Sequence, residues 1–275
     1  MEINYFNGDN MKDVKILIAT HKQYFVPKDP IYLPIHVGKD SNHNETEFQP
    51  DNIGDNISIK NPKFCELTGL YWRWKNLKAD YIGLVHYRRY FKLNKKRCRS
   101  EEEKFKYVLN SQEVEGLLDK ADIILPKSRN YVIENLYDHY KHTMYVEPLD
   151  LAGEIIKEKY PEYSKEFDRL KKRTSAHMFN MFIMKKEYFD EYCTWLFDIL
   201  FELENRVKDK EKDYDSFHLR FYGRVSELLL DVWINTKGYS YEECKVVDMQ
   251  HINWLKKGTS FLTAKFFGKK YDKSF

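Results

Sequence analysis

Short, continuous apolar runs are the feature that most constrains the fold of this 275-residue chain. VKILIA at 14–19, IGLV at 82–85 and IILP at 123–126 lack the polar alternation of a strand that is solvated on one face. Such runs are typical of strands buried on both faces of a parallel sheet. Between the first two, apolar residues recur at helical spacing at Phe64, Leu67, Tyr71 and Trp74. This alternation of strand and helix predicts an α/β fold, with a mainly parallel central sheet flanked by helices.

Similar patterns predict the other elements. Residues 24–61 are rich in Pro, Gly, Asn and Asp, which indicates loops with short strands. Asn61 and Pro62 are expected to open a helix as its N-cap and first residue, and this helix should end near Asn76. Further helices are predicted at 101–118, 188–203 and 223–234, and over most of 130–173. Further strands are predicted at 177–184 and 244–249.

The composition is that of a folded protein. Hydrophobic residues make up 42% and aromatic residues 16% of the chain, which allows a sizeable core and excludes a disordered chain. No linker divides the sequence, so we expect one domain at 1–258 and a basic aromatic tail at 259–275. In the tail, lysines alternate with Phe261, Phe266, Phe267, Tyr271 and Phe275. The tail either associates with an anionic membrane surface or packs on its own domain.

The cysteines and the N-terminus predict the compartment. Cys65, Cys98, Cys193 and Cys244 are scattered without a CxxC pair, as expected for reduced thiols in a cytosolic protein. The N-terminus lacks an apolar segment of signal-peptide length, and no run of about 18 apolar residues occurs. We therefore expect a cytoplasmic protein, which the tail would hold at the inner face of the membrane if it associates with lipid.

Polar side chains, with cations among them, follow the predicted strands at the edge where open α/β sheets bind ligands. They include Thr20, His21 and Lys22 after the first strand, His86, Tyr87, Arg88 and Arg89 after the second, and Lys127 after the third. An arginine fork fits a phosphate bidentately and stays charged at any working pH. The chain has no GxGxxG and no GxxxxGK[ST] motif. We therefore interpret these residues as a site for a diphosphate, with salt bridges to other parts of the protein as the alternative.

A metal ion is the other common partner of a diphosphate, and the sequence does not favour one. No DxD motif follows an apolar strand, and Asp213-Tyr214-Asp215 lies in a charged loop. Arginines in place of a metal are the sharper hypothesis, so we expect no cofactor and metal-independent chemistry. If the strand persisted through Arg88 and Arg89, only one of the two could face the crevice, because neighbouring strand residues point to opposite faces.

Five segments together resemble one bacterial family. They are ELTGLYWRWKN, YIGLVHYRRYF, ADIILPK, HMFNMFIMKKEYFDEYCTWLF and RFYGRVSELLLDVWI, in this order along the chain. This combination resembles the DUF4422 family, which is similar to glycosyltransferases of capsule and O-antigen gene clusters and includes galactofuranosyltransferase domains. The resemblance implies a GT-A-like fold, a UDP-sugar donor such as UDP-galactofuranose, and a lipid-linked or growing glycan acceptor.

An inverting transfer of this type, which the family analogy implies, needs a carboxylate that takes the proton of the acceptor hydroxyl. Glu227 is our candidate, at the start of a predicted helix, where it could instead complement the helix dipole. Asp150 and Asp248 are weaker candidates. Contacts to the acceptor or sugar are expected from His139, His142, His177 and Asn180, and a nucleotide contact from Asn76. His139 and His142 could alternatively hold a metal with a third ligand or lie on a surface helix.

Two other functions remain open from the sequence. Basic and aromatic residues interleave at 85–99 and in the tail, as in some nucleic-acid-binding modules. An isoelectric point of about 8.4 and the lack of a nucleic-acid-binding motif argue against that function, and we expect no nucleic-acid partner. The other alternative is a non-catalytic scaffold for a polysaccharide assembly complex at the membrane surface.

Overall fold

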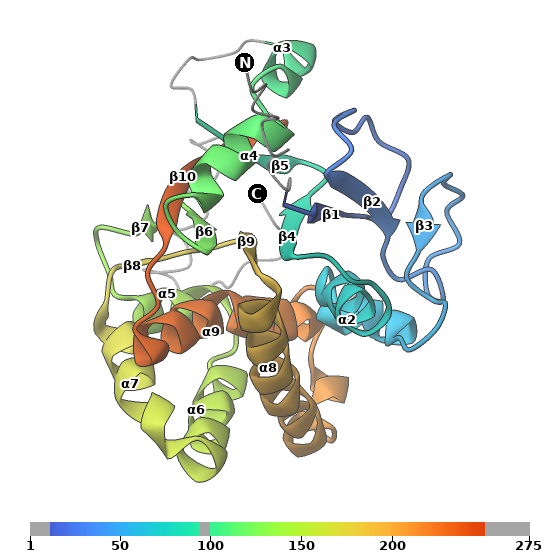
Figure 1. Cartoon of the computed structure of the whole chain (residues 1–275). Coiled ribbons are helices and arrows are strands. Elements are labelled where there is room, and N and C mark those ends of the chain that lie inside the picture. Colours follow the sequence, from blue (N-terminus) through green and yellow to red (C-terminus); the bar gives the residue numbers. More distant parts are fainter. Residues whose placement is uncertain (1–11, 94–99, 251–275) are drawn as a thin grey trace, which may run out of the picture.

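An eight-stranded mixed sheet crosses the computed structural model, which describes residues 12–93 and 100–250 (Figure 1). In order across the sheet, the strands are β3 (Gln49–Pro50), β2 (Tyr32–His36), β1 (Val14–Thr20), β4 (Tyr81–His86), β5 (Arg89–Lys92), β10 (Glu242–Asp248), β6 (Ile123–Pro126) and β9 (Phe182–Lys185). Two short strands, β7 (Arg129–Asn130) and β8 (Ser175–Ala176), form a separate pair.

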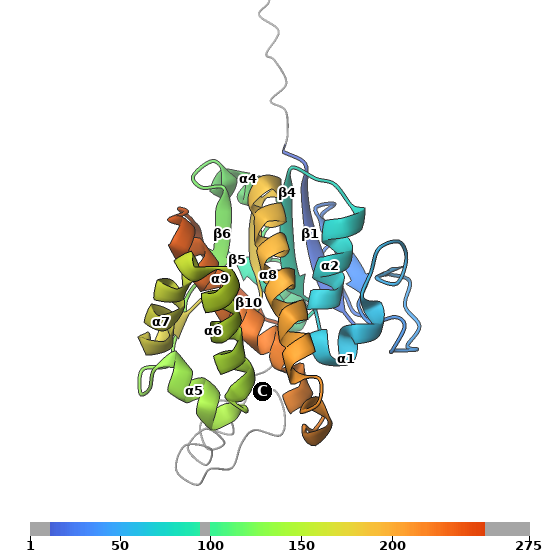
Figure 2. The same cartoon turned by 90° about the horizontal axis from the view of Figure 1, so that it is seen from below.

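Helices cover both faces of the sheet (Figures 1 and 2). The α-helices of the described chain are α1 (Asn61–Phe64), α2 (Leu67–Asn76), α3 (Glu101–Phe105), α4 (Ser111–Leu118), α5 (Leu136–Thr143), α6 (Glu147–Lys159), α7 (Ser164–Lys172), α8 (Lys186–Val207) and α9 (Phe221–Lys237). Short 3-10 helices are η1 (Ser58–Lys60), η2 (Pro161–Tyr163), η3 (Glu211–Asp213) and η4 (His218–Arg220). None of the helices in the described ranges has the length and apolar character needed to cross a bilayer.

The α/β class is confirmed, and the sheet that was expected to be mainly parallel is mixed, with both parallel and antiparallel pairs. β1 is parallel to both β2 and β4. Because α1 and α2 lie between β1 and β4 along the chain, this second pairing is the one that the alternation of strand and helix predicts. β4 is antiparallel to both β5 and β9. β5 follows β4 through a tight turn, which can only produce an antiparallel pair. β4 and β6 are connected across the sheet in two ways. β9 pairs with both of them, and β5 and β10 together form a second bridge between them.

The core lies in two layers, one on each face of the sheet. Along β1, Leu17 and Ala19 pack in the larger layer, which includes residues of α2, α6, α8 and α9. Ile16 and Ile18 point to the opposite layer, which includes residues of α4. This alternation within one apolar run is the burial on both faces that VKILIA predicts.

Three predicted elements are interrupted in ways that affect the site. The helix expected from Asn61 is divided into α1 and α2 at Cys65, whose φ is 53°, and Asn61 is not its N-cap. The predicted strand 177–184 begins only at β9, because Phe179 and Asn180 have left-handed φ values of 81° and 50°. The predicted helix 101–118 consists of α3 and α4, and a capping box at Asn110 starts the second. The predicted tail at 259–275 lies outside the described residues.

Candidate active site

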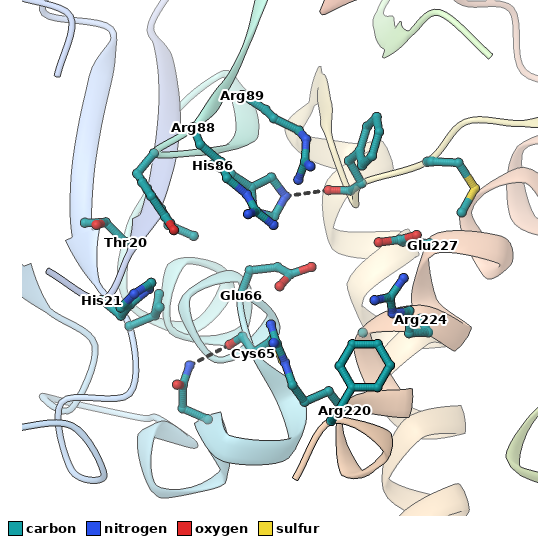
Figure 3. A pocket seen from close by; sticks show the side chains of 18 of the residues that line it. Thr20, His21, Cys65, Glu66, His86, Arg88, Arg89, Arg220, Arg224 and Glu227 are labelled. Carbon is teal, nitrogen blue, oxygen red and sulfur yellow. Dashed lines mark hydrogen bonds between the residues drawn. The ribbon is translucent and has the colours of Figure 1, made fainter. Parts of the chain in front are cut away.

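A cavity of about 680 Å³ opens beyond the carboxyl ends of β1 and β4 (Figure 3). Its volume is within the range of small-molecule sites. The walls come from the ends of β1 and β4, the α1–α2 junction, β7, α5, the segment before β9, and α9. Of the residues predicted from the sequence, those that line it are Thr20, His21, His86, Tyr87, Arg88, Arg89, His139 and Glu227.

The turn between β4 and β5 places two adjacent arginines in this cavity. His86 pairs with Arg89 across the hairpin, so Tyr87 and Arg88 form its two-residue tip. The alternation of a continued strand therefore does not apply, and Arg88 and Arg89 both line the cavity. The Nε atom of Arg89 lies 3.1 Å from Oδ2 of Asp248. Within residues 12–93 and 100–250, no ion pair engages Arg88.

Three further arginines line the cavity and were not predicted as site residues. Arg220 donates from Nε to Sγ of Cys65 at 3.0 Å, and Arg129 lies 5.0 Å from the centre of the Tyr131 ring. Arg224 lies 5.4 Å from the centre of the Phe217 ring. A signal was present in RFYGR, because residues four apart lie on the same side of a helix. These cations make the cavity suitable for an anionic ligand.

Two carboxylates, Glu66 and Glu227, enter the cavity from different helices (Figure 3). Burial raises the pKa of Glu227 above its ordinary value, although the charge of Arg224 opposes this. Burial would also raise the pKa of Glu66, but the adjacent His86 and a hydrogen bond from Asn180 hold it below the ordinary value. Carboxylates of one site with separated pKa values are suited to different roles. Glu66 was not predicted. Glu227 lies in the second turn of α9 rather than at its start.

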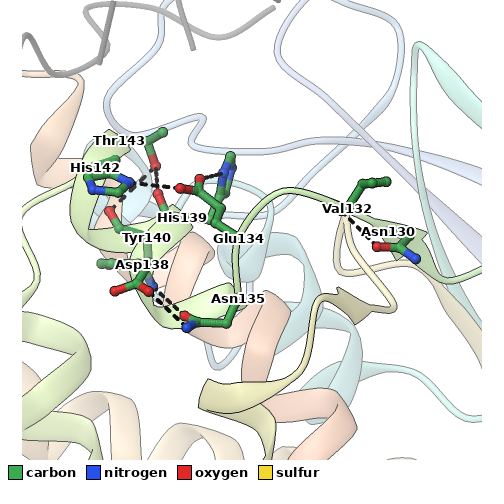
Figure 4. A network of polar contacts seen from close by, with 9 residues as sticks. All are labelled: Asn130, Val132, Glu134, Asn135, Asp138, His139, Tyr140, His142 and Thr143. Atoms are coloured by element: carbon green, nitrogen blue, oxygen red, sulfur yellow. Dashed lines mark hydrogen bonds and ion pairs between the residues drawn. The ribbon is translucent and has the colours of Figure 1, made fainter. Parts of the chain in front are cut away.

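His139 and His142, both in α5, hydrogen-bond the same carboxylate, that of Glu134 in the loop before this helix (Figure 4). Nδ1 of each ring lies 2.8 Å from one oxygen of Glu134. Burial lowers the pKa of His139 to about 4, against the hydrogen bond to Glu134, so its ring is neutral at pH 7. His139 lines the cavity, whereas His142 does not. His142 holds Glu134 from outside the cavity lining, and the expected sugar contacts of the two histidines stay predictions.

Three residues expected to bind the nucleotide do not line the cavity. Lys22 and Lys127 are exposed outside it. Asn76 ends α2 and holds the loop before η1 through hydrogen bonds with Asp55. A helix that precedes a parallel strand runs back along the sheet, so its last residue lies at the edge opposite the carboxyl ends.

His177 and Asn180 are buried outside the cavity lining, which corrects the expectation of direct sugar contacts. The His177 ring hydrogen-bonds Asp231 through Nδ1 and Glu243 through Nε2. Asn180 donates from Nδ2 to Oε1 of Glu66 at 2.8 Å. Asn180 therefore acts on the cavity wall through Glu66 and through Gly223, whose backbone oxygen also accepts from its Nδ2.

The remaining acidic candidates have structural contacts. Asp150 accepts a hydrogen bond from the Tyr137 hydroxyl at 3.2 Å. Asp215 of the Asp213-Tyr214-Asp215 triplet accepts from the backbone N–H groups of Phe217 and His218. In the part of the chain that the structure describes, no three His, Cys, Asp or Glu side chains are grouped to hold a metal ion.

The part of the chain that forms this site matches the model of a known protein family. The model for the domain of unknown function DUF4422 matches residues 15–238, which include all residues that line the cavity. The chain belongs to the DUF4422 family. No curated protein matches this DUF4422 chain.

A solved structure is also similar to this DUF4422 chain. It is an apo structure of the bifunctional glycosyltransferase WbbM, with 32% sequence identity and a TM-score of 0.79. The match covers 87% of this chain and 46% of the WbbM chain. The DUF4422 chain thus corresponds to about half the length of that bifunctional protein.

Proposed function

We propose that this DUF4422 chain is a glycosyltransferase that moves a sugar from a UDP-sugar donor to a glycan or lipid-linked acceptor. The observation that carries the proposal is a single cavity with five arginines and a carboxylate, Glu227, whose pKa is raised. Such a site can hold a diphosphate and accept a proton beside it. The similarity to WbbM, a bifunctional glycosyltransferase, supports the same reaction class.

In this proposal the donor diphosphate binds the arginines of the cavity, and Arg88 makes the main contact with it. The bond between the anomeric carbon and the diphosphate oxygen breaks, and the electron pair leaves with the diphosphate. Fixed cations stabilise the negative charge that develops there. The arginines take the place of a divalent metal, so the reaction is metal-independent on a GT-A-like fold.

Glu227 acts as the general base. The acceptor hydroxyl oxygen forms the new bond to the anomeric carbon, and its proton moves to the carboxylate of Glu227. A carboxylate with a raised pKa is a stronger base and is therefore suited to this step. Attack from the face opposite the leaving diphosphate inverts the anomeric configuration. His139, neutral and held by Glu134, contacts a hydroxyl of the sugar or acceptor.

The family resemblance supports galactofuranose or galactose as the transferred sugar and polysaccharide synthesis as the setting. The acceptor is then a lipid-linked or growing glycan at the cytoplasmic face of the membrane. The basic aromatic tail at 259–275 would hold the enzyme there.

A binding screen followed by a transfer assay tests this function. Calorimetry with uridine diphosphate and UDP-sugars, in the presence of a chelator, should detect binding to the wild-type protein. The Arg88→Ala variant should bind these ligands more weakly. Mass spectrometry should then detect sugar transfer from the bound donor to a glycan acceptor. Absence of binding to every nucleoside diphosphate and nucleotide-sugar, with and without divalent metal, would reject the proposal.

A further inference from the structure

Two adjacent non-glycine residues, Phe179 and Asn180, have left-handed backbone conformations just before β9. A positive φ is uncommon for any residue other than glycine and is an outlier for a bulky aromatic. Such strain persists only where surrounding contacts hold it, and it is concentrated at functional sites.

The contacts of this turn all lead into the cavity. The backbone oxygen of Phe179 accepts a hydrogen bond from Nε2 of His86, and its ring lies 4.5 Å from the guanidinium of Arg89. Asn180 donates from Nδ2 to Oε1 of Glu66 and to the backbone oxygen of Gly223, at 2.8 and 3.0 Å. The strained turn therefore positions groups of the cavity wall, and Glu66 is one of them.

Glu66 itself is held in an unusual position. It follows Cys65, whose φ is 53°, at the break between α1 and α2. Its carboxylate extends into the cavity toward the carboxylate of Glu227 (Figure 3). Among the residues that the structure describes, no salt bridge engages Glu66, and Asn180 binds only Oε1. Glu66 thus lines the cavity with one oxygen, Oε2, that no side chain of the described residues hydrogen-bonds.

We propose that Glu66 binds the transferred sugar of the donor and stabilises the positive charge that develops at its anomeric carbon. This inference rests on the proposed function and adds a residue to it. Oε2 accepts hydrogen bonds from hydroxyl groups of the sugar, as carboxylates commonly do. As the bond to the diphosphate oxygen breaks, the sugar ring becomes positively charged, and a fixed anion beside it lowers the barrier. Glu66 gives and takes no proton, since the acceptor proton goes to Glu227.

The surroundings of the two carboxylates separate their roles. Burial opposes ionisation of Glu66, but the adjacent His86, the hydrogen bond from Asn180 and the nearby charge of Arg220 favour it and lower its pKa. Of the two carboxylates, Glu66 is therefore the more readily ionised. Glu227, for which burial dominates, more readily accepts a proton.

Glu66→Gln is the decisive variant, because glutamine keeps an oxygen for the Asn180 amide, loses the charge and replaces the acceptor Oε2 by an amide donor. We expect kcat to fall by roughly 10²–10³-fold. Affinity for uridine diphosphate, which has no sugar, should stay within about threefold of wild type, and affinity for the UDP-sugar should fall. Because Glu227 is retained, the fall of kcat/KM at low pH should persist. Glu158→Gln is the matched control, since Glu158 pairs with Arg206 away from the cavity.

A second variant keeps the inference testable if Glu66→Gln does not fold. Asn180→Gly permits the left-handed backbone and removes the amide that holds Glu66. It should lower kcat while binding of uridine diphosphate is retained. If the wild-type protein transfers sugar and either folded variant has a near-normal kcat, the role of Glu66 is overturned. The glycosyltransferase proposal would then remain intact. Wild-type protein that binds no nucleotide-sugar would instead reject both.

Discussion

Nε of Arg89 lies 3.1 Å from Oδ2 of Asp248, and this pair separates the two adjacent arginines of the β4–β5 turn. The side chains of the pair are only 11% and 15% exposed. Arg89 thus already has a counter-charge in β10, whereas no ion pair of Arg88 is found in the described ranges. Of these two adjacent arginines, Arg88 is therefore the better placed to meet a diphosphate.

The first prediction separates binding from stability at these arginines. Arg88→Ala should weaken uridine diphosphate binding by roughly 10–100-fold without changing the melting temperature, since it removes charge-assisted hydrogen bonds to the ligand. Arg89→Ala should lower the free energy of unfolding by about 2–3 kcal/mol, because Asp248 is then left without its partner. Calorimetry and thermal denaturation measure the two effects.

The double variant Arg89→Ala with Asp248→Ala is the control. It should recover part of the lost stability, because no uncompensated carboxylate remains. Equal loss of stability in the Arg88 and Arg89 variants would contradict the assignment.

The second prediction concerns the pH dependence of turnover. Glu227 must be ionised to accept a proton, and burial raises its pKa, so kcat/KM should fall as the pH decreases through a value above the ordinary one for glutamate. Glu227→Gln should lower kcat by roughly 10²–10⁴-fold and remove this acid limb. Steady-state kinetics from pH 4.5 to 8 measure both. An unchanged acid limb in the variant would exclude Glu227 as the base.

The third prediction concerns the buried His177. Burial would lower the pKa of its ring, but hydrogen bonds to Asp231 and Glu243 raise it above the ordinary value. The stabilisation is therefore complete below about pH 6.5, the ordinary value of an unfolded histidine, and is lost as the pH rises through the folded-state pKa. Urea denaturation should therefore show a lower free energy of unfolding above that window than below it.

His177→Gln should be less stable than wild type at pH 6 and should lack this loss at higher pH. Glu243 also accepts from the backbone N–H of Ser128, beside Arg129, so the variant is expected to weaken ligand binding modestly. The same pH dependence in wild type and variant would assign the effect to another group.

The fourth prediction is that removal of divalent metal leaves turnover unchanged. Arg88 and the other cavity arginines supply the charge that a metal would otherwise provide. Initial rates measured after exhaustive chelation should match rates measured with added Mg²⁺ or Mn²⁺. A rate that depends strictly on either ion would disprove the metal-independent mechanism.

The pattern of residues close together in the sequence predicts the strands and helices well. It predicts the residues that line the cavity only in part. VKILIA and IILP are strands because their side chains suit burial on both faces, and this is visible within a few residues. Lys127, directly after a strand, was therefore expected in the cavity, but Arg129 lies there instead. A shift of two residues depends on how the chain turns after β6, and local periodicity does not report it.

The sequence by itself determined the α/β class, the apolar strands and the edge at which cationic residues gather. Only the tertiary structure decided which side chains share the cavity. Asn180 and Glu66 are 114 residues apart, and Arg220 and Cys65 are 155 apart, yet each pair is in contact. Periodicity is set by neighbouring residues, whereas a site is set by long-range packing and by backbone conformations such as those of Cys65 and Phe179, which propensity does not favour.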